Sequence, residues 1–109
     1  MWTLKVATTT PTPETGSGTD TDKPLVFRLP EGAVKTVGRT AHSDFILDAA
    51  LVSRVHCRLM ATMMGELHVE DLDSTNGTFV NDQRVDRAVL NTGDRLRVGR
   101  VELAVTKES

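Results

Sequence analysis

Residues 96–105 read LRVGRVELAV, and this stretch decides the fold class. On both sides of its centre, large apolar side chains recur at every second position, which is the period of a half-buried β-strand. The central pair, Gly99-Arg100, suits a two-residue turn because glycine tolerates the backbone angles of tight hairpins. The stretch therefore predicts two antiparallel strands joined by a hairpin.

The same period of two recurs along most of the chain. Leu67 and Val69 alternate with polar residues, and so do the apolar positions of residues 55–60. The pair Asn81-Asp82 is a second candidate for a tight turn. Because no long segment has a convincing helical period, we expect an all-β fold. Its predicted form is a two-sheet antiparallel β-sandwich of about 10–11 short strands.

The 109 residues fit one domain. We expect a first strand at residues 1–6, a flexible Thr/Pro-rich loop at 7–24, the rest of the sandwich at 25–106 and a tail at 107–109. The loop is predicted because residues 7–24 hold almost no apolar side chain that burial could stabilise. In the alternative, the whole N-terminal stretch is a disordered tail outside the fold. The apolar alternation of Trp2, Leu4 and Val6 favours the strand.

Composition and charge exclude several classes of protein. Cys57 is the only cysteine, so no intramolecular disulfide forms, and no zinc-like spacing of ligands occurs. The net charge of −2 argues against a nucleic-acid binder. We expect neither a membrane span nor a signal peptide, because no apolar run is long enough for a span and the first residues lack the apolar stretch of a leader. The expected location is the cytoplasm, with no cofactor and no metal.

Four polar motifs follow one another between the predicted strands. Gly38-Arg39 ends a strand over residues 34–37, and Ser53-Arg54-Val55-His56 opens another. The remaining two motifs are the turn DSTNGT at 73–78 and the stretch LNTGDRL at 90–96. Each motif alone is weak, but all four in this order form a specific signal.

Together these motifs resemble the forkhead-associated (FHA) domain family over roughly residues 25–105. The resemblance implies an FHA/SMAD-like sandwich with binding loops at one end, which recognises phosphothreonine in extended protein segments and catalyses nothing. It implies a phosphate site made by Arg39, Ser53, Arg54 and Thr75. It also implies that Asn76 binds the peptide main chain, and that Gly38, His56 and Gly77 support the site structurally.

These residue types suit the ligand chemically. A phosphothreonine presents a charge of about −1.5 to −2 and three acceptor oxygens near neutral pH. Arg39 offers a planar fork that can grip two of these oxygens, and Ser53 offers a hydroxyl donor. Turn residues such as Thr75 add main-chain N–H groups. With a net charge of −2, any attraction for phosphate has to be local.

Two further features concern specificity and partners. The resemblance also implies that loop residues read the third residue after the phosphothreonine, and residues 48–52 are the expected loop. Because Ala49, Ala50 and Leu51 are apolar, they favour a hydrophobic residue there. The expected partner is a threonine-phosphorylated protein, or the chain's own loop, downstream of a Ser/Thr kinase. The candidate phosphoacceptors in that loop are Thr12, Thr15, Thr19 and Thr21.

Two rival functions use the same residues. The first is a phospho-independent interaction scaffold on the same fold, which would not need Arg39. The second is an enzyme, because Ser53 and His56 with Asp71 or Asp73 contain the residue types of a catalytic triad. The sequence lacks the Gly-x-Ser-x-Gly turn of many serine hydrolases. We therefore expect no enzyme.

Overall fold

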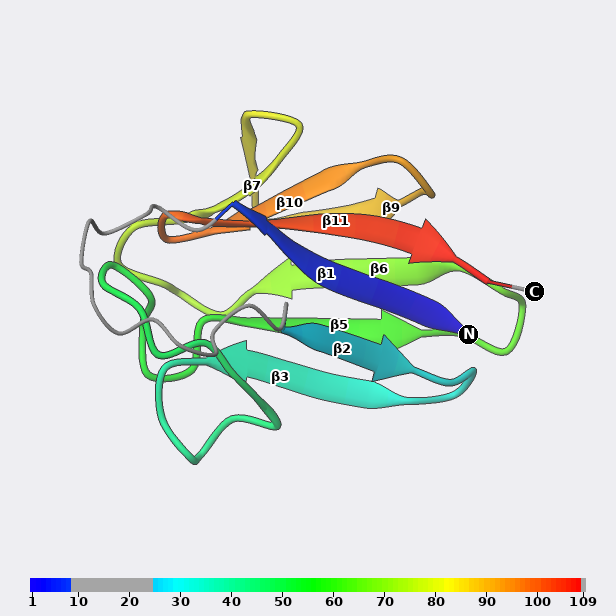
Figure 1. Cartoon of the computed structure of the whole chain (residues 1–109), viewed down its shortest axis with the longest axis horizontal. Helices are drawn as coiled ribbons and strands as arrows, with labels where there is room; N and C mark the ends of the chain where they lie inside the picture. The colour runs from blue at the N-terminus through cyan, green and yellow to red at the C-terminus, as the bar shows by residue number, and fades with distance from the viewer. Residues whose placement is uncertain (9–24, 109) are drawn as a thin grey trace, which may run out of the picture.

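The computed structural model describes residues 1–8 and 25–108. This part of the chain folds into eleven strands without a helix, which confirms the all-β prediction (Figure 1). It accordingly contains no helix that could cross a membrane. The predicted phosphoacceptors Thr12, Thr15, Thr19 and Thr21 lie outside the described residues.

The strands form two sheets that pack face to face. The first sheet has the order β2 (Val26–Leu29), β1 (Trp2–Thr8), β11 (Val101–Lys107), β10 (Arg95–Val98), β7 (Thr78–Val80), β8 (Gln83–Val85). The second has the order β4 (Phe45–Ile46), β3 (Val34–Gly38), β5 (Cys57–Ala61), β6 (Leu67–Asp71), β9 (Arg87–Leu90). All neighbouring strands are antiparallel except β3 and β4, which are parallel.

Both predicted tight turns are present. Val98 pairs with Val101 across Gly99-Arg100, and Gly99 has a φ of 63°. In the second hairpin, Val80 pairs with Gln83. Its turn residues, Asn81 and Asp82, have φ angles of 50° and 71°, as a type I′ turn requires. Asparagine and aspartate tolerate this left-handed region better than most residues, which explains their use here.

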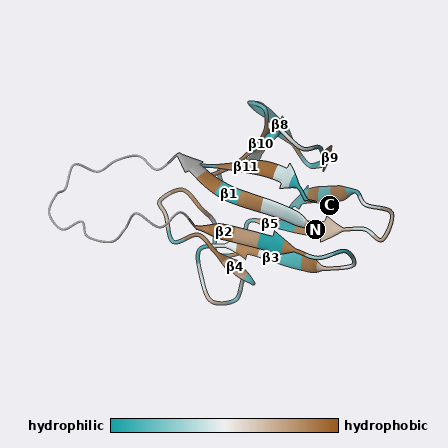
Figure 2. Ribbon diagram, turned by 45° about the vertical axis from the view of Figure 1, so that its right-hand side comes forward, coloured by the Kyte–Doolittle hydropathy of each residue, from teal (hydrophilic) through white to brown (hydrophobic). Residues whose placement is uncertain are grey.

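The apolar positions of the strands meet between the sheets. Leu96 and Leu103 from the first sheet are fully buried, as are Leu59 and Val69 from the second. Figure 2 shows hydrophobic and hydrophilic positions alternating along strands such as β3. Trp2 and Leu4 belong to this core because β1 lies between β2 and β11 and pairs with both.

One predicted strand boundary is wrong. The strand expected to open at Ser53 begins only at Cys57. The main-chain N–H of Ser53 donates to the ring of His56 instead of to a neighbouring strand. This local side-chain hydrogen bond competes with a sheet ladder and keeps residues 53–56 in a loop.

Several loops gather at one end of the sandwich. β3 ends there at Gly38, β6 ends at Asp71, and β7 begins there at Thr78. The hairpin between β10 and β11 lies at the same end, while both chain termini lie at the other (Figure 1). Antiparallel connections thus bring three of the four polar sequence motifs, at residues 38–39, 53–56 and 73–78, to this end. The fourth motif, at residues 90–96, follows β9 at the opposite end, where the Lys107 N–H donates to the Thr92 hydroxyl at 3.2 Å.

Candidate functional site

Two exposed arginines lie on adjacent loops at this end. Arg39 directly follows β3, and its main-chain N–H donates to the carbonyl of Ser53 at 2.9 Å. The next carbonyl, that of Arg54, accepts a hydrogen bond from the hydroxyl of Ser43 at 2.9 Å. Within the described residues, neither guanidinium has a hydrogen-bond or ion-pair partner. The main chains of Arg39 and Arg54 are therefore fixed, while their charged side chains stay available.

Ser53 and the turn at residues 73–77 form the next part of the site. The Ser53 hydroxyl oxygen accepts from the main-chain N–H of Thr75 at 3.0 Å. A hydroxyl that accepts one hydrogen bond can still donate another, so Ser53 keeps a donor. Asn76 is exposed, and its side-chain amide donates to the Leu51 carbonyl at 3.1 Å. These two contacts hold the turn against the loop that carries Ser53.

His56 is fully buried beneath these loops. Its Nδ1 accepts from the Ser53 N–H at 3.0 Å, and its Nε2 lies 2.8 Å from the Gly77 carbonyl. A neutral ring with its proton on Nε2 satisfies both contacts. Because both ring nitrogens are used by main-chain groups, neither can serve as a base for the Ser53 hydroxyl. The geometry therefore rejects the catalytic-triad alternative.

Two glycines allow the loops to approach closely. A Cβ on Gly38 would overlap the carbonyl of Arg54 and the hydroxyl of Ser43. Gly77 has a φ of 93°, a left-handed conformation that favours glycine. Its carbonyl is the one that His56 contacts, and its N–H donates to the Ser74 hydroxyl at 2.9 Å.

Asp71 is a structural residue of the site that the sequence analysis considered only as a triad member. Its carboxylate accepts from the Ser74 hydroxyl at 2.5 Å, the Ser74 N–H at 3.2 Å and the Thr78 hydroxyl at 2.7 Å. Burial raises the pKa of Asp71, but the hydrogen bonds from Ser74 and Thr78 outweigh it and leave this pKa below its usual value. An aspartate at a strand end with a serine three residues later is the local signal of such a turn.

The predicted specificity loop divides into two parts. Ala49 is half-buried and packs against the core, while Ala50 and Leu51 are exposed. Leu51 has a φ of 71°, and a Cβ on Gly99 would lie 2.8 Å from its carbonyl group. The β10–β11 hairpin therefore supports this loop, and Ala50 and Leu51 present its exposed apolar surface.

Comparison with known proteins identifies the family. The FHA domain matches residues 35–99. An ABC transporter ATP-binding/permease protein of Mycobacterium tuberculosis is 42% identical over 79 residues, which are 72% of this chain and 9% of that protein. The glycogen accumulation regulator GarA of the same organism is 40% identical over 75 residues, or 69% of this chain and 46% of GarA. The chain thus spans less than half the length of these relatives.

Solved structures of similar fold are also FHA domains. The FhaA FHA domain, crystallised with the intracellular domain of Rv3910, superposes with a TM-score of 0.76 at 30% identity, covering 96% of this chain and 99% of that one. A structure from a study of phosphothreonine-dependent FHA domain interactions gives a TM-score of 0.78 at 29% identity, covering 99% and 97%. The chain is therefore a member of the family of FHA, or forkhead-associated, domains.

Proposed function

We propose that this domain binds phosphothreonine within extended segments of partner proteins and performs no catalysis. The observation that carries the proposal is the pair of exposed arginines, Arg39 and Arg54, on the loops that meet at Ser53. Neither guanidinium is neutralised by another described residue. Membership of the FHA family supports phosphopeptide binding, and a similar FHA structure comes from work on phosphothreonine-dependent interactions.

The proposed contacts follow from the donors at the site. Arg39, Arg54 and the hydroxyls of Ser53 and Thr75 would surround the phosphate, and Asn76 would bind the peptide main chain. The main-chain N–H of Thr75 is not among these donors, because it already donates to the Ser53 oxygen. A guanidinium grips two phosphate oxygens at once, which gives both attraction and orientation. Discrimination of threonine from serine would come from a niche for one methyl group, which is worth about 1–3 kcal/mol.

Calorimetric titration of one peptide sequence in three forms tests this proposal. We expect the phosphothreonine form to bind more tightly than the phosphoserine form, and the unmodified form to show no measurable binding. Affinity should fall below about pH 6, where the phosphate gains its second proton. Equal affinity for the three forms would contradict the proposal and favour the phospho-independent scaffold.

The chain's own threonine-rich segment is a second proposed ligand. β1 ends at Thr8 and β2 begins at Val26, and the Val6 N–H donates to the Leu25 carbonyl at 3.0 Å. Both ends of segment 9–24 therefore join the fold at the same end as the site loops (Figure 1). A tethered ligand has a high effective concentration, in the millimolar range for short flexible linkers.

Treatment with Ser/Thr kinases would test the self-ligand. We expect mass spectrometry to find phosphate on Thr12, Thr15, Thr19 or Thr21, and external phosphopeptide binding to weaken afterwards. External binding that is unchanged by a phosphorylated segment would rule this idea out. A kinase pathway and a cytoplasmic location remain predictions, as does the absence of nucleic-acid and membrane partners.

A further inference from the structure

The arginines of this domain fall into two groups. Arg58 and Arg87 contact Glu70, Arg95 contacts Glu102, and Arg97 lies 3.9 Å from Asp82. The other group has no carboxylate within ion-pair distance among the described residues, and it consists of Arg28, Arg39, Arg54, Arg84 and Arg100. Arg39 and Arg54 belong to the proposed phosphate site, which raises the question of what the other unpaired arginines bind.

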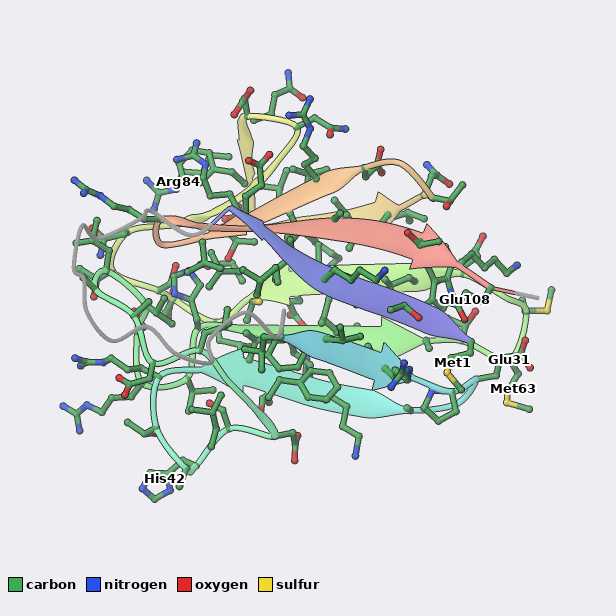
Figure 3. All side chains as sticks on the ribbon, viewed as in Figure 1. Met1, Glu31, His42, Met63, Arg84 and Glu108 are labelled. Atoms are coloured by element: carbon green, nitrogen blue, oxygen red, sulfur yellow. The ribbon has the colours of Figure 1, made fainter. Side chains whose placement is uncertain are left out.

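Among these, Arg84 has a side chain that lies against the turn of the proposed site. It lies on β8 opposite Phe79 of β7, and its Nε and Cζ lie 2.9 and 3.1 Å from where a Cβ on Gly77 would be. Gly77 directly follows Asn76, the residue proposed to bind the peptide main chain. Figure 3 shows Arg84 at the end of the sandwich where the site loops gather.

The neighbours of Arg84 keep this arginine close to the turn. Phe79 also borders Gly77, with a ring carbon 3.2 Å from the same Cβ position. On the outer face of the sheet, the Arg97 guanidinium covers the Phe79 ring at 4.2 Å. Arg97 thus contacts Phe79 and Asp82. The guanidinium of Arg84 instead lies next to Gly77, which has no side chain that could cover this guanidinium.

We propose that Arg84 binds an anionic side chain flanking the phosphothreonine, either an acidic residue or a second phosphate. This inference rests on the proposed function. The planar guanidinium matches both anions, because each presents paired oxygens that accept two parallel hydrogen bonds. The result is a preference for acidic or doubly phosphorylated segments, added to the recognition of the phosphothreonine itself.

The anion read by Arg84 is distinct from the residue read by the specificity loop. β7 lies between β10 and β8 in its sheet, and Gly77 immediately precedes β7. Leu51 packs against Gly99 on the β10 side, whereas Arg84 is on the β8 side. The two therefore flank the Asn76-Gly77 turn on opposite sides and face different residues of a bound segment.

A position walk tests the proposal. Phosphothreonine peptides with neutral flanks receive one aspartate at each flanking position in turn, and a second series receives a second phosphothreonine. We expect wild-type affinity to rise about tenfold, or about 1.4 kcal/mol, at one position or two adjacent ones. Arg84→Gln should lose this gain and still bind the neutral-flank peptide as wild type does. Whichever series gives the gain identifies the source of the anion.

Arg28→Gln is the matched control, because it removes the same charge from an exposed, unpaired arginine toward the other end of the sandwich. It should keep the gain. Retention of the gain in Arg84→Gln, or no gain at any position while the neutral-flank peptide binds, would overturn the role of Arg84 and leave the proposed function intact. A wild-type domain that fails to bind the neutral-flank phosphothreonine peptide would overturn both.

Discussion

The main chain of Arg39 stabilises the fold, and its side chain is proposed to bind the phosphate. Its N–H is bonded to Ser53, whereas its guanidinium has no described partner. Arg39→Ala should therefore reduce phosphothreonine-peptide affinity at least about a hundredfold, because two charge-assisted hydrogen bonds are lost. The free energy of unfolding should change by less than about 0.5 kcal/mol. Calorimetry and urea denaturation measure the two effects, with Arg28→Ala as control, and an unchanged affinity would refute the role of Arg39.

His56 should behave in the opposite way. His56→Ala leaves the buried Gly77 carbonyl and the Ser53 N–H without partners and creates a cavity, so we expect a loss of stability of about 3 kcal/mol or more. His68→Ala is the control, because among the described residues the His68 ring hydrogen-bonds only to the exposed Glu66, at 3.1 Å, and its loss should cost less than about 1 kcal/mol. Urea unfolding measures both variants. Similar losses for the two would argue against a supporting role for His56.

The residue types of the candidate site could be predicted from the sequence, but most of the hydrogen bonds that these residues make could not. The cations and hydroxyls of the candidate site were predicted from their chemistry and from the family resemblance. The Ser53 oxygen accepts from the Thr75 N–H, and this contact between residues 22 positions apart leaves no local pattern in the sequence. The arrangement of Arg84 over Gly77 depends on the β7–β8 pairing and was missed for the same reason.

At the scale of elements, the turn between β6 and β7 depends on one carboxylate. The hydrogen bonds from Ser74 and Thr78 lower the pKa of Asp71 in the folded state despite burial, which raises it. The unfolded value is about 3.9, so this stabilisation is complete above that pH and is lost as the pH falls through the lower, folded-state pKa.

Asp71→Asn should therefore cost about 1–3 kcal/mol at pH 7, because charge-assisted hydrogen bonds are lost. The difference from wild type should narrow as the pH falls below about 4. Urea denaturation across this pH range measures it. Asp86→Asn is the control, because the Asp86 carboxylate accepts no hydrogen bond from another described residue. A difference that is constant with pH would contradict this account.

Elements with a clear period were predictable, and elements that depend on their partners were not. The β10–β11 hairpin follows from alternation and one glycine. β4 has only two residues and exists because Phe45 and Ile46 pair with β3, so no period could reveal it. β5 begins at Cys57 and not at Ser53, because the Ser53 N–H donates to the His56 ring. Local side-chain hydrogen bonds and long-range pairing therefore set the boundaries that periodicity missed.

At the scale of the whole molecule, the reactivity of the buried Cys57 thiol shows whether the core is folded. Burial, with a smaller effect from the negative charge of Asp71, raises the pKa of the Cys57 thiol to about 12. The reactive thiolate is therefore scarce at neutral pH, and the sulfur is inaccessible. We expect no reaction with a thiol reagent in native buffer and full reaction in urea, with labelling that follows the unfolded fraction. Rapid labelling of the native domain would contradict the burial of this thiol.

The pairing of β1 with β11 brings the two ends of the chain together. The Met1 amine donates to the Glu108 carbonyl at 3.1 Å, and the Glu108 N–H donates back to the Met1 carbonyl at 2.8 Å. Domains with neighbouring ends tolerate insertion into a host chain. Because the ends lie opposite the site loops, a sensor surface or fluorescent protein attached at either end would leave the proposed peptide-binding loops pointing outward.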